Sequence, residues 1–85
     1  MRMLPNDVLP LTMVTPGQTV KLLDICAERK LRRRLTELGL TTGTELRVMQ
    51  DQGGPVLIAI RDTRLALGRR MAQRILVDFR QEMPE

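Results

Sequence analysis

The sequence predicts a small, mainly β protein: a five-stranded barrel with one short α-helix inserted after the first strand. Short segments with alternating apolar residues are separated by turn signals at even, close spacing. One segment, residues 29–38, instead has the helical period. A chain of 85 residues forms one domain with a thin core, and closing the sheet removes exposed strand edges. An SH3-like barrel fits this pattern best.

The first long strand is predicted at residues 18–26, after the turn signal Pro16-Gly17. Alternation divides its side chains between two faces. One face carries Val20, Leu22, Asp24 and Cys26, and the other carries Lys21, Leu23 and Ile25. Neither face is purely polar, so we expect both to be partly covered.

The helix is predicted from Leu31, Leu35 and Leu38, which recur at i, i+4 and i+7 and would face the core. Gly39 follows at the position where helices end in a positive φ angle, and Leu40 is placed for the hydrophobic contact of a Schellman ending.

The remaining strands follow with short connections. The segment 45–50 alternates apolar and polar residues, and the glycine-containing hairpin loop DQGGP leads into the strand 56–60. A tight turn then precedes the strand 64–67, a single helical turn comes next, and the last strand covers 74–79. Gly17 and Gly43 are further structural residues in the predicted turns.

These elements define three parts of the chain: an N-terminal lead-in at 1–10, a barrel domain at 11–79 and a flexible tail at 80–85. The N-terminus lacks the apolar core of a signal peptide, and the longest apolar run outside it has five residues, too few to span a membrane. The single cysteine fits a reducing compartment. We therefore expect a cytoplasmic protein.

The composition favours binding over catalysis. The net charge of +4 suits an acidic partner, whether nucleic acid, an anionic membrane surface or an acidic protein. The chain has no histidine, which removes the commonest general base and transition-metal ligand, and it has no phosphate-binding or nucleophile motif. We therefore expect no enzymatic activity and no obligatory cofactor.

A metal site is a weaker possibility, for ferrous or another divalent ion. Its candidate ligands are Asp24, Cys26 and Glu28. One thiolate and one carboxylate do not complete a four-coordinate site within one chain, although a site shared by two chains would. A small, half-buried core cysteine is the favoured interpretation of Cys26.

The densest basic run lies in the predicted helix. A helical wheel spreads its arginines around the exposed arc, so they do not share one face. Arg33 points to water, and Arg34 lies at the border of the apolar stripe, with Glu37 one turn further on. Aromatic residues for base stacking are also missing. A solvated polar surface therefore explains most of the run. The exception is Arg34, with Arg33 beside it, where we expect a protein contact; no nucleic acid is expected.

A second basic set lies around the last turn of the barrel. It consists of Arg61, Arg64, Arg69, Arg70 and Arg74. Arg69 and Arg70 next to Met71 form a mixed basic and apolar patch, which suits a protein partner as well as nucleic acid. A solvated surface and a partner site remain equal alternatives there.

Two motifs resemble the ferrous iron transport protein A (FeoA) family. One is RLTELGLTTGTEL, with an Arg-Leu, Leu-Gly-Leu and Gly-Thr string. The other is an A-L-x-R-x-x-A-x-x-I arrangement that ends at Ile75. The resemblance covers about Leu11 to Val77. The family usually has Arg directly after the Ala-Leu pair, where this chain has Gly68.

The resemblance implies a cytosolic SH3-like barrel that serves a bacterial ferrous iron uptake system as an accessory or regulatory subunit. It implies contact with a membrane iron permease that carries a cytoplasmic G-protein domain, so that the chain reaches the membrane only through this partner. A homodimer is also compatible with so small a barrel. Two other functions stay open: a basic small-barrel nucleic-acid-binding protein, and a metal-responsive module akin to the C-terminal domain of iron-dependent repressors.

Overall fold

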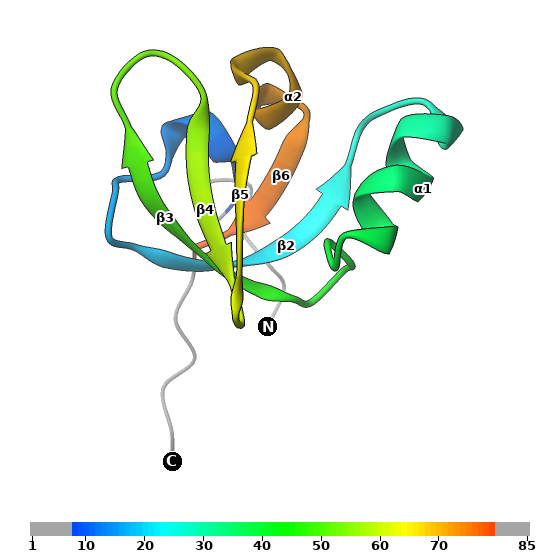
Figure 1. Cartoon of the computed structure of the whole chain (residues 1–85), viewed down its shortest axis with the longest axis horizontal. Helices are drawn as coiled ribbons and strands as arrows, with labels where there is room; N and C mark the ends of the chain where they lie inside the picture. Colours follow the sequence, from blue (N-terminus) through cyan, green and yellow to red (C-terminus); the bar gives the residue numbers. More distant parts are fainter. Residues whose placement is uncertain (1–7, 80–85) are drawn as a thin grey trace.

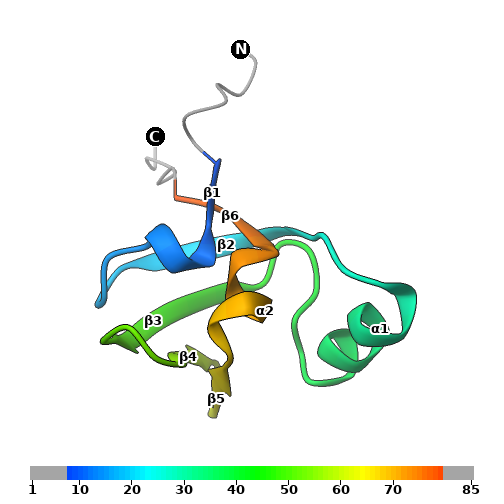
Figure 2. The ribbon, with the colours of Figure 1, turned by 90° about the horizontal axis from the view of Figure 1, so that it is seen from above.

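The computed structural model describes residues 8–79, which form six strands in one antiparallel sheet, two short α-helices and a 3-10 helix. The strand order is β1-β6-β2-β3-β4-β5. The sheet curves so that β1, β6 and β2 form one layer and β3, β4 and β5 the other, as the view in Figure 2 shows. No helix in this part of the chain is long and apolar enough to cross a membrane.

The elements follow the predicted order closely (Figure 1). Their bounds are β1 Val8–Pro10, η2 Leu11–Met13, β2 Thr19–Ile25, α1 Arg29–Glu37, β3 Glu45–Asp51, β4 Val56–Ile60, β5 Thr63–Leu67, α2 Arg69–Gln73 and β6 Ile75–Asp78. The mainly β class is confirmed, and the helix predicted at residues 29–38 is α1, which ends one residue earlier. The predicted tail at 80–85 and residues 1–7 of the predicted lead-in lie outside the described residues.

The strand count differs from the prediction because part of the predicted lead-in is structured. Val8–Pro10 form β1, which pairs with β6 in the register Val8↔Asp78 and Pro10↔Leu76. The sequence does not predict this strand, because a three-residue segment that ends in proline is too short to show an alternation of apolar and polar residues. Proline is tolerated here because β1 is an edge strand. The helix α1 therefore follows the second strand, not the first.

The core is aliphatic and draws on almost every element. Its sixteen buried residues are Leu11, Val14, Val20, Leu22, Ile25, Leu35, Leu40, Leu46, Val48, Val56, Ile58, Ile60, Leu67, Ala72, Ile75 and Val77. No buried polar or charged side chain is found among the described residues. Burial of apolar surface is thus the main force that holds the two layers together.

A bulge in β2 changes which side chains reach the core. The register with β6 shifts between Leu22 and Asp24, so an extra residue reverses the alternation beyond it. As a result Ile25 is buried, while Asp24 and Cys26 are both exposed. The predicted face that joined Val20 and Leu22 to Asp24 and Cys26 is therefore wrong, and so is the half-buried setting predicted for the cysteine.

The end of α1 has the predicted Schellman geometry. The Gly39 N–H donates to the Thr36 carbonyl at 3.0 Å, and the Leu40 N–H donates to the Leu35 carbonyl at 3.0 Å. The reversal turns Leu40 into the core, where it is fully buried. Leu38, predicted to face the core, is 47% exposed. It caps a helix that already ends at Glu37, and Leu40 fills the apolar position instead.

Gly39 provides a test of this helix ending, because its φ angle is +105° and an added Cβ would meet no atom within 4 Å. Any cost of Gly39→Ala is therefore conformational, and we expect a loss of about 1–2 kcal/mol in the free energy of unfolding. Urea unfolding measures this change.

Gly68→Ala is the matched control. Gly68 has a φ angle of −56°, and its added Cβ also has open space. Alanine lowers the conformational entropy of the unfolded chain, which stabilises the fold, but it caps the helix less well than glycine, which destabilises the fold. Because the two effects oppose each other, we expect the free energy of unfolding to change by no more than about 0.5 kcal/mol. Equal losses for the two variants would contradict the conformational explanation.

Candidate functional site

The exposed face of α1 is the first candidate site. Only Leu35 of its nine residues is buried, and Leu31 is half-buried against the core. The helix has no side-chain cap at Glu28 and no acidic residue in its first turn. A helix this short is not stable alone, so its few contacts with the barrel hold it in place. Most of its surface is therefore free for a partner.

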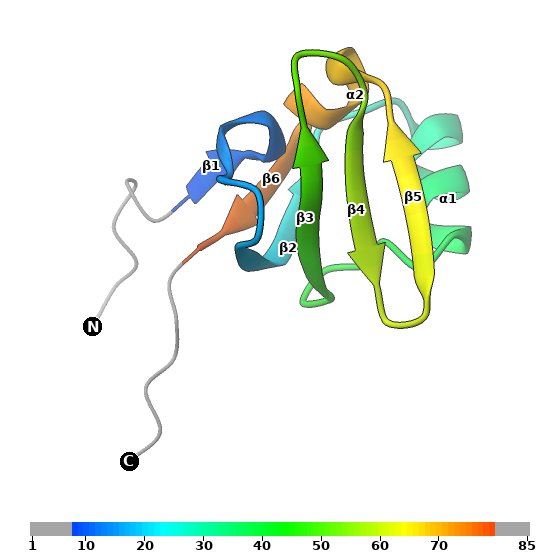
Figure 3. The same ribbon diagram turned by 60° about the vertical axis from the view of Figure 1, so that its left-hand side comes forward.

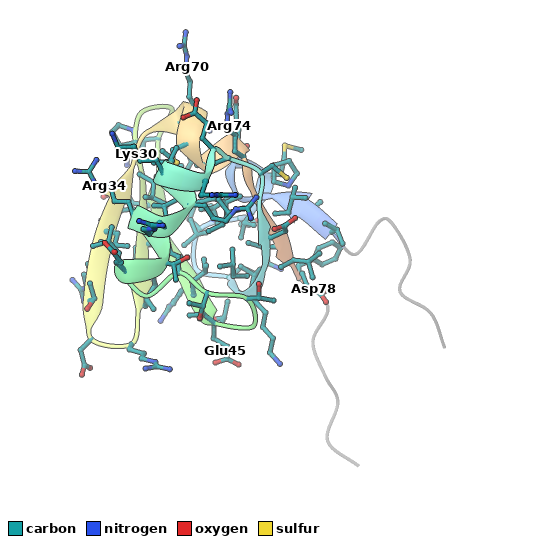
Figure 4. All side chains as sticks on the ribbon, turned by 90° about the vertical axis from the view of Figure 1, so that its right-hand side faces the viewer. Lys30, Arg34, Glu45, Arg70, Arg74 and Asp78 are labelled. Carbon is teal, nitrogen blue, oxygen red and sulfur yellow. The ribbon has the colours of Figure 1, made fainter. Side chains whose placement is uncertain are left out.

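Three cations and two carboxylates gather on this face. They surround an open depression of about 560 Å³, which is lined by Glu28, Lys30, Leu31, Arg33, Arg34 and Glu37. Lys30 and Arg34 extend to the same side of the helix (Figure 4). The predicted trio of Arg33, Arg34 and Glu37 is thus brought together. The separation of Arg33 from Arg34 on the helical wheel does not prevent both from lining one depression.

Arg69 serves the fold. Its guanidinium donates two hydrogen bonds to the Asp51 carboxylate, from Nη1 to Oδ1 at 2.6 Å and from Nη2 to Oδ2 at 3.1 Å. Nη1 also donates to the Gly54 carbonyl at 2.9 Å. This bidentate contact fastens α2 to the end of β3 and to the β3–β4 loop. Neither partner is wholly exposed, at 35% for the Arg69 side chain and 9% for Asp51.

The contact changes the acidity of Asp51. Hydrogen bonds from Arg69, and then from the Gly53 N–H, hold the pKa of the Asp51 carboxyl below its ordinary value, and partial burial opposes them. The Asp51 hydrogen bond also raises the pKa of Arg69. An Asp before two glycines does indicate a turn stabilised by its side chain, and the Gly53 N–H donates to it at 3.3 Å. No local pattern in the sequence indicates that Arg69, which lies 18 residues further along the chain, is the partner of Asp51.

The other residues of the predicted patch do not join the α1 site. Met71 is half-buried and packs against the core, and Arg70 extends from α2 in a different direction from Arg34 (Figure 4). Neither lines the depression on α1. Arg70 stays exposed. The predicted partner surface is therefore two separate surfaces, one on α1 and one around α2.

The predicted metal ligands do not assemble. Across residues 8–79, no three side chains from His, Cys, Asp and Glu lie close enough to hold an ion. The Asp24 carboxylate accepts a hydrogen bond from the Ile25 N–H at 2.8 Å. Cys26 and Glu28 are exposed near it in sequence. Within this chain these groups offer an ion too few ligands for a closed site.

The Asp51–Arg69 contact leads to a pH-dependent prediction for Arg69→Gln. The folded-state pKa of Asp51 is lowered, so the stability from this contact is present above the ordinary pKa of 3.8 and is lost as pH falls through the folded value. We expect the variant to unfold at lower urea concentration than the original protein at pH 7, and the difference to shrink as pH falls below 3.8, to the part that the Arg69–Gly54 hydrogen bond contributes.

Arg70→Gln is the control for this comparison. Arg70 is exposed, and it makes no side-chain hydrogen bond or ion pair with any residue between 8 and 79. We expect no change in its urea midpoint at either pH. A difference between Arg69→Gln and the original protein that had the same size at pH 7 and at low pH would show that the ion pair is not its source.

Comparison with known proteins agrees with this architecture. A crystal structure of an iron uptake regulatory protein, FeoA, is 30% identical and covers 84% of this chain and 94% of its own, with a TM-score of 0.75. The zinc complex of Stenotrophomonas maltophilia FeoA, described as a prokaryotic SH3 domain protein, is 30% identical over 80% of this chain and 87% of its own, with a TM-score of 0.72. The predicted SH3-like class is thereby confirmed.

The same domain occurs within larger proteins. A manganese-dependent transcriptional repressor is 25% identical and covers 92% of this chain with a TM-score of 0.79, but the match spans only 44% of the repressor. Among curated proteins, the "Putative Fe(2+) transport protein A" of Methanocaldococcus jannaschii is 33% identical over 69 residues, which are 81% of this chain and 84% of that protein. With this relative, and with residues 9–78 matching the model of the FeoA domain, the chain belongs to the FeoA family.

Proposed function

We propose that the protein is a small, non-enzymatic accessory subunit of a ferrous iron uptake system. It acts in the cytosol by binding a membrane iron permease and its cytoplasmic G-protein domain. Membership of the FeoA family supports the system, because the M. jannaschii relative is described as an Fe(2+) transport protein. The choice of the permease as partner rests on the resemblance of this chain's sequence motifs to the family.

The observation that carries the proposed contact is the exposed face of α1. Lys30, Arg33 and Arg34 line one depression, and Arg33 and Arg34 make no side-chain hydrogen bond or ion pair with the described residues. Exposed cations around a half-buried leucine form the kind of surface that binds proteins, where Arg is enriched. We exclude Arg69 from this surface because it is bound to Asp51.

Binding to the cognate permease tests the proposal. We expect purified protein to bind the permease in nanodiscs, and Arg33→Glu/Arg34→Glu to weaken binding about tenfold or more, because each reversal replaces attraction by repulsion. Biolayer interferometry measures the dissociation constant, and circular dichroism checks that the variant is folded.

Arg29→Glu/Arg32→Glu is the matched control on the same helix. It changes the net charge equally, but neither residue lines the depression. Its affinity is expected to fall by no more than about threefold, through the general field alone. Equal losses for both variants would mean that only net charge matters. Unchanged binding by Arg33→Glu/Arg34→Glu would remove this surface, and no binding by the original protein would remove the proposed function.

A further inference from the structure

A second basic site lies on the face of the sheet that points away from the core. Strand registers align four residues in one row across β2, β3, β4 and β5: Thr19 pairs with Arg47, Arg47 with Ala59, and Ala59 with Arg64. Side chains alternate along each strand, and Leu46, Val48, Ile58 and Ile60 occupy the core face. The row therefore faces outward. Figure 3 shows β3, β4 and β5 side by side.

Ala59 makes a gap between two arginines. Adjacent strands lie about 4.8 Å apart, so the backbones of Arg47 and Arg64 are about 9.6 Å apart across the intervening strand. The methyl group of Ala59 cannot fill this space. An open depression of about 310 Å³ lies here, lined by Arg47, Ala59, Arg61 and Arg64 together with Met49 and Glu45. Arg61 comes from the β4–β5 turn, which closes this end.

The three arginines have no carboxylate partner among the described residues. Arg47, Arg61 and Arg64 are all exposed, and none makes a side-chain hydrogen bond or an ion pair with any of residues 8–79. Like charges across a sheet repel one another. Guanidinium groups that flank a small residue can both donate to one carboxylate, which relieves this repulsion.

The neighbourhood of the gap identifies the kind of ligand. Met49 and Leu57 lie half-buried on the same outward face, and Leu57 pairs with Ala66. Base stacking has no aromatic platform here, because Phe79, the one aromatic residue of the chain, packs against the core. Apolar groups beside unpaired arginines suit a protein segment that alternates acidic and apolar side chains.

We propose that the row formed by Arg47, Ala59 and Arg64 is a binding site for an acidic segment of a protein partner. A carboxylate of the segment lies over Ala59 between the two guanidinium groups, with Arg61 beside it, and apolar side chains of the segment cover Met49 and Leu57. This surface differs from the α1 surface in every residue, so the proposal does not depend on the permease contact.

Glu45 opposes this binding. It also lines the depression, and it pairs in register with Lys21 of β2. Its side chain extends from the end of the molecule opposite to Arg70 (Figure 4). An acidic ligand is repelled by this carboxylate, and removing its charge should therefore strengthen binding.

The test uses a blocked peptide of three Glu-Leu repeats, titrated into the ¹⁵N-labelled full chain at physiological salt. In an extended peptide the glutamates share one side and the leucines the other. A peptide that runs along the row, flat on the sheet, therefore directs its glutamates toward Arg47 and Arg64 and its leucines toward Met49 and Leu57. We expect saturable chemical-shift changes at the amides of Arg47, Ala59 and Arg64, and none with a peptide in which Gln replaces Glu. Glu45→Gln should tighten binding about twofold to threefold.

Two variants distinguish a built site from a general positive field. Arg47→Glu/Arg64→Glu should weaken peptide binding about tenfold or more. Ala59→Leu leaves every charge in place but fills the gap, and it should weaken binding by a similar factor; urea unfolding confirms that it is folded. Arg29→Glu/Arg32→Glu, with the same charge change on α1, should retain binding within about threefold.

Three outcomes would overturn the proposal. The first is peptide binding that Ala59→Leu leaves unchanged, since the gap would then play no part. The second is shift changes confined to α1. The third is a single-stranded oligouridine of equal charge that binds the row more tightly than the peptide, which would assign the surface to nucleic acid. Each of these leaves the permease proposal unaffected.

Discussion

The pairing of β6 with β2 is the contact on which the rest of the structure depends. It joins the last strand to the first long one, in the register Leu22↔Val77 and Ile25↔Ile75. All four of these side chains are buried, so the pairing places both halves of the core at once. It also positions α2, which immediately precedes β6, at the end of the barrel where Arg69 reaches Asp51. Such contacts between distant segments slow folding, because the entropy of closing the intervening loop is lost before the contacts form.

Much of this arrangement was predictable from local patterns. The Schellman ending could be predicted because Gly39 and Leu40 are read from consecutive positions. Strands β3, β4 and β6 could be predicted because every second residue that faces the core is apolar, as Val56, Ile58 and Ile60 are in β4. In each case the signal and the structure lie within one element.

The predictions that were wrong or incomplete concern features that depend on residues far apart in the sequence. The bulge that buries Ile25 and exposes Asp24 is fixed by pairing with β6, some fifty residues further along the chain. Leu38 is exposed because Leu40, after the turn at Gly39, occupies the apolar position in the core instead. For the candidate site, the predicted Arg33, Arg34 and Glu37 do meet on α1, but the role of Arg69 is set by Asp51, which no local pattern connects to it. Alternation predicts that Arg47 faces outward, but only the register places it opposite Ala59 and Arg64.

The shallow anchoring of α1 has a consequence for motion. Leu35 is its one buried residue, and Leu40 holds the turn that follows, whereas the rest of the described residues contribute fourteen other buried side chains, eleven of them in strands. We therefore expect the free energy of opening this helix locally to be smaller than that of unfolding the barrel, so that its amide hydrogens exchange with solvent before those of β2 or β6. Moving α1 would disturb few buried contacts, whereas moving the sheet face that carries Arg47 and Arg64 would break the hydrogen-bonded pairing of β3, β4 and β5. The two proposed surfaces thus differ in how firmly they are held as well as in chemistry: one lies on a helix with a single buried residue, and the other lies within a hydrogen-bonded sheet.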